Sequence, residues 1–138
     1  MIEKKDSYSF ADFYEIIGEL RGEHGCPWDK KQTHGSLKIC LENECQEVLE
    51  AIDQYENTGN WENLCEELGD VLLQILLHSR IAEEEGLFTI EDVVTGISKK
   101  MIGRHPHVFG ELSPAYAEGR TLSWDEIKAL EKGWRTKS

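Results

Sequence analysis

The sequence is short of basic residues, with 15 lysines and arginines against 27 aspartates and glutamates, for a formal net charge of −12. Binding of nucleic acid through its phosphates needs a basic surface, so this charge argues against such a role. No stretch approaches the roughly 18 apolar residues of a membrane span, and the first residues do not resemble a signal peptide. We therefore expect a cytoplasmic chain that binds neither nucleic acid nor membrane.

Motifs based on cysteine, on histidine pairs and on phosphate-binding loops are also scarce. The four cysteines form no CxxC pair, so without an export signal we expect reduced thiols rather than disulfides. His105 and His107 lack a matching Cys/His pair at zinc-ligand spacing, which disfavours a zinc site. The GxxxxGK[ST] motif of P-loop ATPases is missing. Any contact with phosphate must therefore come from a metal ion and from basic side chains.

Apolar residues recur at spacings of three and four almost throughout the chain, which predicts amphipathic helices. The expected helices cover about residues 8–22, 37–56, 61–86 and 89–103. No strand-like alternation is present, so we predict an all-α helical bundle built on an antiparallel helix hairpin. At 138 residues we expect one catalytic domain over 1–110, with a tail over 111–138 whose short helix packs on it.

The breaks between these helices are expected to be loops. Gly25, Pro27 and their neighbours predict a loop, with Ser36 as the cap of the next helix. The segment 105–110 is predicted to end the fourth helix and to pack Phe109 into the core. Residues 71–77 are apolar nearly all round, which is typical of a helix buried on more than one side. In so small a chain a second subunit would supply that cover, so we expect a homo-oligomer.

The most informative pattern is a set of four acidic residues on the second and third expected helices, namely Glu44, Glu47, Glu67 and Asp70. The two members on each helix are three residues apart, so they project from one face. The turn between the helices is short, which predicts antiparallel packing. Facing positions then have a constant sum of residue numbers, and both pairs (47 with 67, 44 with 70) give 114. The four carboxylates should therefore converge, roughly 15 Å from the turn.

Four carboxylates at the margin of a buried seam repel one another and lose hydration, which calls for a cation. Oxygen ligands suit Mg²⁺, or Mn²⁺, and these ions commonly take substrate phosphates as further ligands. The alternative is that these residues are ordinary exposed acids, because ExxE spacings arise by chance in a chain with 27 acidic residues. The shared register favours the metal site.

Five short segments, in this order, closely resemble the MazG-type nucleoside triphosphate pyrophosphohydrolases. They are Cys26-Pro27-Trp28-Asp29, Gln32-Thr33-His34, Glu44-x-x-Glu47, Glu67-Leu68-Gly69-Asp70 and Arg104-His105-Pro106-His107-Val108-Phe109. The resemblance runs from about residue 20 to residue 109. One departure is Asn43, where the family often has a second glutamate beside the ligand. This departure removes a helper role at that position and leaves the four-ligand set intact.

The resemblance implies an all-α core, a dimer or higher homo-oligomer, dependence on Mg²⁺, and hydrolysis of ribo- or deoxynucleoside triphosphates to monophosphate and pyrophosphate. It implies that the four acids of the ExxE and ExxD segments bind the metal. It also implies that Lys100 and Arg104 lie against the triphosphate, and Trp124 falls near the position of a family aromatic that can contact the base. We expect either Glu44 or Glu47 to accept a proton from the attacking water.

Two weaker substrate contacts are Lys38 and Trp28. Lys38 lies near the start of the metal-binding helix, and its alternative role is simple solvation. Trp28 follows a Cys-Pro pair, where a tryptophan more often anchors a loop in the core.

Two other functions remain open at this point. One is a narrower pyrophosphatase of the same helical superfamily, acting on dUTP, dCTP or phosphoribosyl-ATP. The other is a non-enzymatic helical interaction module whose acids are only surface charge. The segments at 26–29 and 105–109 favour a general pyrophosphohydrolase, such as one that serves nucleotide-pool housecleaning, over the narrower enzymes, whose families carry different flanking motifs.

Overall fold

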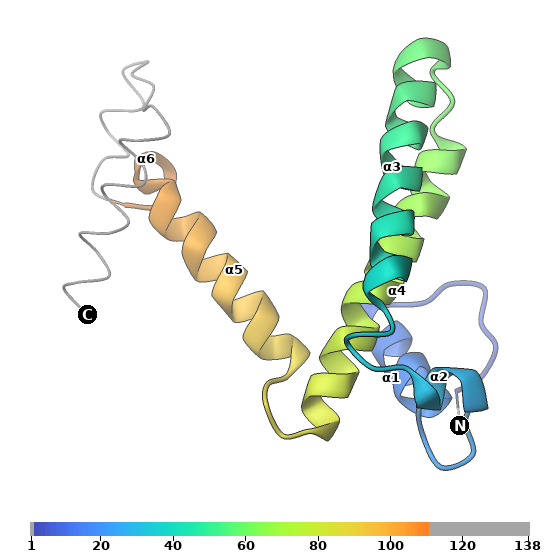
Figure 1. Cartoon of the computed structure of the whole chain (residues 1–138). Helices are drawn as coiled ribbons and strands as arrows, with labels where there is room; N and C mark the ends of the chain where they lie inside the picture. Colours follow the sequence, from blue (N-terminus) through green and yellow to red (C-terminus); the bar gives the residue numbers. More distant parts are fainter. Residues whose placement is uncertain (1, 111–138) are drawn as a thin grey trace. The chain divides into compact units, whose positions relative to one another are not determined.

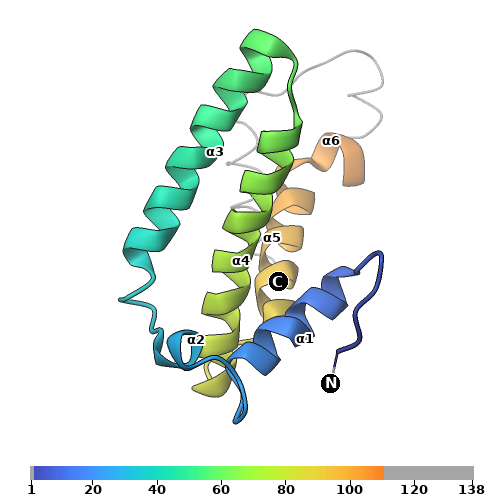
Figure 2. The same ribbon diagram turned by 90° about the vertical axis from the view of Figure 1, so that its right-hand side faces the viewer.

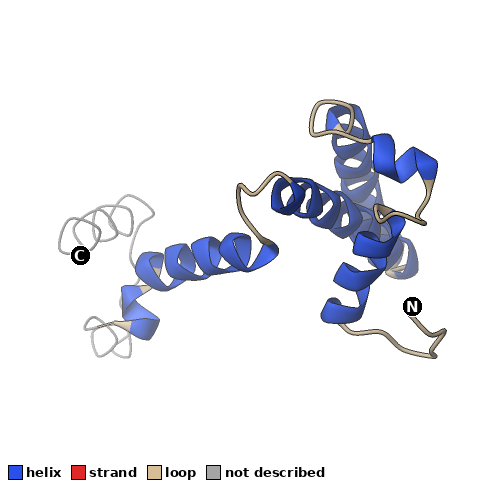
Figure 3. Cartoon of the chain, turned by 90° about the horizontal axis from the view of Figure 1, so that it is seen from below, coloured by secondary structure: helices blue, strands red, loops and turns tan. Residues whose placement is uncertain are grey.

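The computed structural model describes residues 2–110, and every regular element in that range is a helix (Figures 1 and 3). The predicted all-α class is confirmed. The chain divides into two compact units, Met1–Ile90 and Glu91–Ser138. The division expected at residue 110 stays a prediction, because residues 111–138, with their expected final helix, lie outside the described part. No described helix is long and apolar enough to cross a lipid bilayer.

The first unit is built on a long antiparallel hairpin of two helices (Figures 1 and 2). Its elements are α1 (Phe10–Leu20), α2 (Pro27–Lys31), α3 (Lys38–Thr58) and α4 (Glu62–Glu84). The hairpin turn begins at Gly59, whose φ of 78° is the left-handed conformation that glycine adopts without strain. The predicted pair of antiparallel helices is therefore present, and α1 packs against α4.

Helix α1 starts with a capping box. The backbone N–H of Asp12 donates to the Ser9 hydroxyl at 3.1 Å, and the Ser9 N–H donates to the Asp12 carboxylate at 3.0 Å. These bonds satisfy N–H groups that have no partner within the helix. The helix is shorter than the expected 8–22, because the cap fixes its start and the backbone turns at Arg21.

Helix α2 corrects the expectation of a loop after Cys26. Pro27 occupies its first turn, where the missing N–H costs nothing, and Lys30 and Lys31 lie in its last turn, next to the negative end of the helix dipole. The prediction that Ser36 caps α3 is also wrong. Its hydroxyl donates to the side chain of Gln32 at 2.8 Å and accepts the Thr33 N–H at 2.8 Å. Ser36 thus stabilises the turn before α3, which itself begins at Lys38.

The core of the first unit lies at the end of the hairpin remote from its turn. Its buried residues come from α1, from the start of α3, from the second half of α4 and from the start of the following helix: Ile17, Leu37, Leu76, Leu77, Ile81 and Ile90. Leu77 is 1% exposed within its own chain, so it needs no second subunit. Ile75, on another face of the same apolar stretch, is 42% exposed.

The described part of the second unit contains α5 (Ile90–Arg104), whose first residue belongs to the first unit, and α6 (Pro106–Phe109). The expected loop at 105–110 is thus a single helical turn with Pro106 in its first position, which suits a residue without an N–H. Phe109 is 61% exposed, so the prediction that it packs into the core is wrong.

Candidate metal centre

Helices α3 and α4 bring four carboxylates together at one level of the hairpin. They are Glu44 and Glu47 from α3, and Glu67 and Asp70 from α4. Each residue offers one oxygen, and the four oxygens all lie within 4.8 Å of one another. Glu47 is exposed, whereas the other three are partly buried. The convergence expected from the shared register is therefore the geometry observed.

Crowding of these acids raises the pKa of two of them. The pKa of Glu67 rises to about 7, because the protonated carboxyl hydrogen-bonds to Glu47, loses hydration, and lies beside the charges of Glu47 and Asp70. The pKa of Glu44 is also raised, first by burial and then by its hydrogen bond with Glu47 and the neighbouring charges. Without a cation the cluster thus holds protons that isolated carboxylates release.

Two buried oxygens of the cluster have no hydrogen-bond donor and would be stabilised by a cation. The Oε2 atoms of Glu44 and Glu67 are buried and accept no hydrogen bond from any described residue. Buried carboxylate oxygens without a donor are costly, and a cation removes that cost. In an octahedral magnesium site with ligands at about 2.0–2.1 Å, opposite oxygens are about 4.2 Å apart, close to the 4.8 Å limit observed. The residues present therefore fit a small, hard divalent cation.

The other predicted site residues are distributed over both units. Lys38 is the exposed first residue of α3. Trp28, in α2, is 56% exposed, which excludes the alternative that it anchors the segment in the core. Lys100 and Arg104 lie one turn apart on α5, both half-buried. Trp124 lies outside the described residues.

A polar contact that sequence reasoning missed connects the segment before α3 to α4. The Nδ1 atoms of His34 and His78 are 2.7 Å apart, so one ring donates and the other accepts, and the rings stack with centroids 5.0 Å apart. Burial, followed by the nearby charge of His34, lowers the pKa of His78. His78 lies two turns beyond Asp70 on α4, a spacing that marks the shared helix face, but no sequence pattern indicated its partner.

Arg21 fixes the position of the segment that carries Trp28. Its guanidinium donates to both carboxylate oxygens of Glu84, at 2.7 and 3.1 Å. It also donates to the carbonyl oxygens of Asp29 at 2.6 Å and Gln32 at 3.1 Å. The side chain of Arg21 is only 7% exposed. One cation thus joins the end of α1, the carbonyls of α2 and the end of α4.

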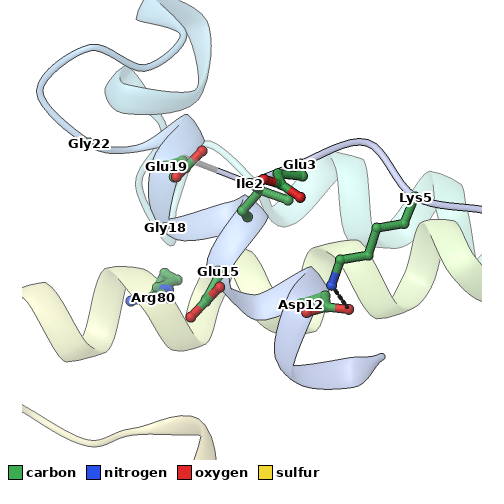
Figure 4. Close-up of a pocket in the computed structure, with 9 residues that line it drawn as sticks. All are labelled: Ile2, Glu3, Lys5, Asp12, Glu15, Gly18, Glu19, Gly22 and Arg80. Carbon is green, nitrogen blue, oxygen red and sulfur yellow. Dashed lines mark hydrogen bonds and ion pairs between the residues drawn. The ribbon is translucent and has the colours of Figure 1, made fainter. Parts of the chain in front are cut away.

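A separate groove of about 720 Å³ runs along α1 and contains none of the four clustered carboxylates (Figure 4). Three of its charged groups, Lys5, Asp12 and Arg80, already serve structural contacts. Lys5 and Asp12 pair at 3.3 Å, and Arg80 donates to the carbonyl of Tyr14 at 2.9 Å and lies over the Tyr14 ring. The buried carboxylate oxygens without a hydrogen-bond donor belong to the carboxylate cluster and not to this groove.

Comparison with known proteins identifies the family. The MazG nucleotide pyrophosphohydrolase domain matches residues 32–109, which contain all four clustered acids. The chain belongs to the MazG family. This confirms the resemblance read from the sequence motifs.

Relatives within the MazG family match most of this chain. The Bacillus subtilis (strain 168) protein YabN is 54% identical over 94% of the chain and 26% of its own length. The Thermotoga maritima nucleoside triphosphate pyrophosphohydrolase/pyrophosphatase MazG is 48% identical over 98% of the chain and 50% of its own length. The chain thus spans a quarter to a half of these two curated relatives.

A solved structure supports the same assignment. The crystal structure of a MazG-related protein from Thermotoga maritima superimposes with a TM-score of 0.60 at 30% identity. The match covers 90% of this chain and 96% of that one. The helical arrangement described above is therefore shared with a family member of similar size.

Proposed function

We propose that this MazG-family chain is a Mg²⁺-dependent hydrolase that converts nucleoside triphosphates to monophosphate and pyrophosphate. The observation that carries the proposal is the convergence of four carboxylate oxygens within 4.8 Å, two of the residues having a buried oxygen without a donor. Relatives named as nucleoside triphosphate pyrophosphohydrolases support the same reaction. Mn²⁺, which has similar ligand preferences, should substitute for Mg²⁺.

The reaction is a hydrolysis in which water oxygen bonds to one phosphorus of the α–β bridge while the bond from that phosphorus to the bridging oxygen breaks. When bound, Mg²⁺ supplies a Lewis acid that polarises phosphate oxygens and lowers the pKa of water. The four acids hold the cation, and Glu44 or Glu47 takes the proton of the attacking water. Glu47, the most exposed of the four, is the more accessible to a water from solvent.

Basic and aromatic side chains would bind the rest of the substrate. Lys100 and Arg104, and more weakly Lys38, would neutralise the negative charge that develops on the phosphates. Trp28 and Trp124 are the proposed contacts to the base, because an aromatic face stacks on any base. The exposure of Trp28 supports this role, since its ring is accessible.

The proposal is tested by neutralising single carboxylates without changing their shape. Glu47→Gln and Asp70→Asn should each abolish Mg²⁺-dependent pyrophosphate release while the helical circular dichroism persists. Glu66→Gln is the matched control, because Glu66 is an exposed acid on α4 outside the cluster, and it should keep wild-type activity. Activity retained in Glu47→Gln and Asp70→Asn would remove the cluster from the chemistry.

A panel of all eight common ribo- and deoxynucleoside triphosphates separates the alternatives. Pyrophosphate is converted to phosphate by inorganic pyrophosphatase and measured with malachite green. A broad signal supports a general pyrophosphohydrolase with a housecleaning role. A signal with one substrate, such as dUTP or dCTP, or with phosphoribosyl-ATP alone, indicates a narrower enzyme. Absence of signal with every substrate supports a non-enzymatic helical module.

We further propose that the chain works as a homodimer or higher homo-oligomer in the cytoplasm, where its substrates are found. Apolar side chains remain exposed along the hairpin, including Leu49 at 56%, Leu68 at 52% and Ile75 at 42%. Contact with another copy would remove this apolar surface from water. Light scattering at micromolar concentration should give at least twice the chain mass of 15.8 kDa, and a monomer would refute the proposal.

A further inference from the structure

Gln74, on α4, is a buried polar residue with an unsatisfied hydrogen-bond acceptor. It is 5% exposed, and its amide oxygen Oε1 accepts no hydrogen bond from any described residue. Buried amide oxygens are normally paired, and one left alone lowers the stability of the folded chain. No donor among the described residues lies within hydrogen-bond distance of this oxygen. A donor that is not part of the protein would remove this loss of stability.

The register of the hairpin places Gln74 one turn beyond the carboxylates, on the side of the apolar core. Leu37 and Leu77 follow the same rule that relates Glu44 to Asp70, since their residue numbers also add up to 114, and both are core residues. Gln74 therefore belongs to the layer between the acidic cluster and the apolar core. It lies one turn beyond Asp70 on the same face of α4.

The direction of helical side chains brings the amide closer still. Long side chains on an α-helix lean toward its N-terminus and lie over the preceding turn. For Gln74 the preceding turn on this face carries Asp70. This general direction favours a placement of the Gln74 amide toward the acidic cluster, where an ionised carboxylate can accept a hydrogen bond but cannot donate one.

A hydrated cation at the carboxylates would supply such a donor. Mg²⁺ usually keeps several of its waters when it binds protein carboxylates. Such a water directs its lone pair toward the cation and its hydrogens outward, so it donates and does not accept. An acceptor with no protein donor, placed one turn below the ligands, matches that requirement.

We propose that Gln74 is a positioning residue of the metal centre, whose amide oxygen holds a water of the cation's hydration shell beneath the carboxylates. This inference rests on the proposed function, because it requires the four acids to bind a divalent cation. It has two consequences for the protein. Gln74 weakens the metal-free fold and strengthens cation binding.

The experiment measures two properties of Gln74→Met, a change that keeps the length of the side chain but removes the amide. The apparent Kd for Mn²⁺ is read from the electron paramagnetic resonance signal of the free ion. It should rise roughly 10- to 100-fold, the usual effect of losing a group that supports a metal ligand. The melting temperature of the chelator-treated protein should stay equal or rise, because an unsatisfied buried acceptor has been removed.

Two further variants complete the test. Gln54→Met is the matched control, since the Gln54 amide oxygen already accepts a hydrogen bond from Asn63 at 3.1 Å. It should keep the wild-type Kd for Mn²⁺ and should not gain stability. Gln74→Glu retains an oxygen acceptor and should bind Mn²⁺ within about threefold of wild type or more tightly.

Each outcome decides between a metal-linked and a merely structural glutamine. A lower melting temperature for metal-free Gln74→Met, or an unchanged Kd, overturns the inference. A Kd for Gln74→Glu as weak as that of Gln74→Met also overturns it. If wild type binds Mn²⁺ and Glu47→Gln does not, the proposed function stands whatever Gln74 does. If wild type and Glu47→Gln both fail to bind Mn²⁺, the two proposals fall together.

Discussion

The raised pKa of Glu67 makes cation binding and proton binding compete at the same oxygens. With a pKa of about 7 in the folded chain, against an ordinary value of 4.5, this carboxyl is about nine-tenths protonated at pH 6. At pH 8 it is about one-tenth protonated. A cation that takes all four carboxylates must displace this proton, since metal ligands bind in their deprotonated form.

The pKa of Glu67 sets the number of protons that the cation displaces at each pH. Saturation with Mg²⁺ should release about 0.9 proton from Glu67 at pH 6 and about 0.1 at pH 8. Glu44, whose pKa is raised in the same direction, adds to both values. The apparent affinity should therefore rise at least about tenfold per pH unit well below pH 7 and rise less steeply above it. Calorimetric titration in two buffers of different ionisation enthalpy measures the protons released.

The same pKa shift affects the stability of the metal-free chain. A carboxyl whose folded pKa exceeds its unfolded pKa stabilises the fold below about pH 4.5, and this contribution is lost as the pH rises through about 7. His78 acts in the opposite sense, because its lowered pKa weakens the folded chain at acid pH, and the loss is regained as the pH rises. The effect of Glu67 on stability is therefore measured as the difference in melting temperature between wild type and Glu67→Gln at each pH.

Glu67→Gln should remove most of the metal-linked proton release and the fall in melting temperature toward alkaline pH. Glu66→Gln, which changes an exposed acid beside the cluster, should leave both unchanged. If Mg²⁺ binds wild type with no proton release at pH 6, or with equal affinity at pH 6 and pH 8, the electrostatic account of the cluster is refuted.

Two predictions concern the framework that holds the site. Leu77→Ala should lower the free energy of unfolding by about 2–5 kcal/mol, because it leaves a cavity in a core where Leu77 is 1% exposed; a loss below 1 kcal/mol in urea titration would show that the core collapses freely around it. Arg21→Lys should cost roughly 1.5–3 kcal/mol, since one ammonium cannot replace donation to Glu84, Asp29 and Gln32. Unchanged urea unfolding would contradict that bridging role.

The carboxylate site was predictable because its information is local. The i, i+3 spacing fixes which side chains share a helix face, and a short turn fixes the register of an antiparallel hairpin. Glu44 and Asp70 can therefore be paired from their residue numbers alone. The same rule, extended by one turn, locates Gln74, but only the hydrogen bonds of the folded chain reveal that its buried oxygen has no partner.

The wrong expectations came from segments where local signals are weak. Glycine and proline predict a loop after Cys26, yet Pro27 starts a short helix. Arg21, at the end of α1, stabilises that helix by a direct hydrogen bond to the carbonyl of Asp29. Phe109, predicted to pack into the core where the segment ends the fourth helix, is 61% exposed. Neither outcome is encoded in spacing, since each depends on which distant atoms approach.

The sequence by itself determined the helical class, the hairpin and the convergence of four acids, because periodicity and register act between residues near in the chain. Tertiary structure alone decided the His34–His78 contact, the four bonds of Arg21 and the isolation of the Gln74 oxygen. It also showed that Leu77 is covered within its own chain while Ile75 is not. These features depend on burial and on contacts between distant segments, which only the folded chain defines.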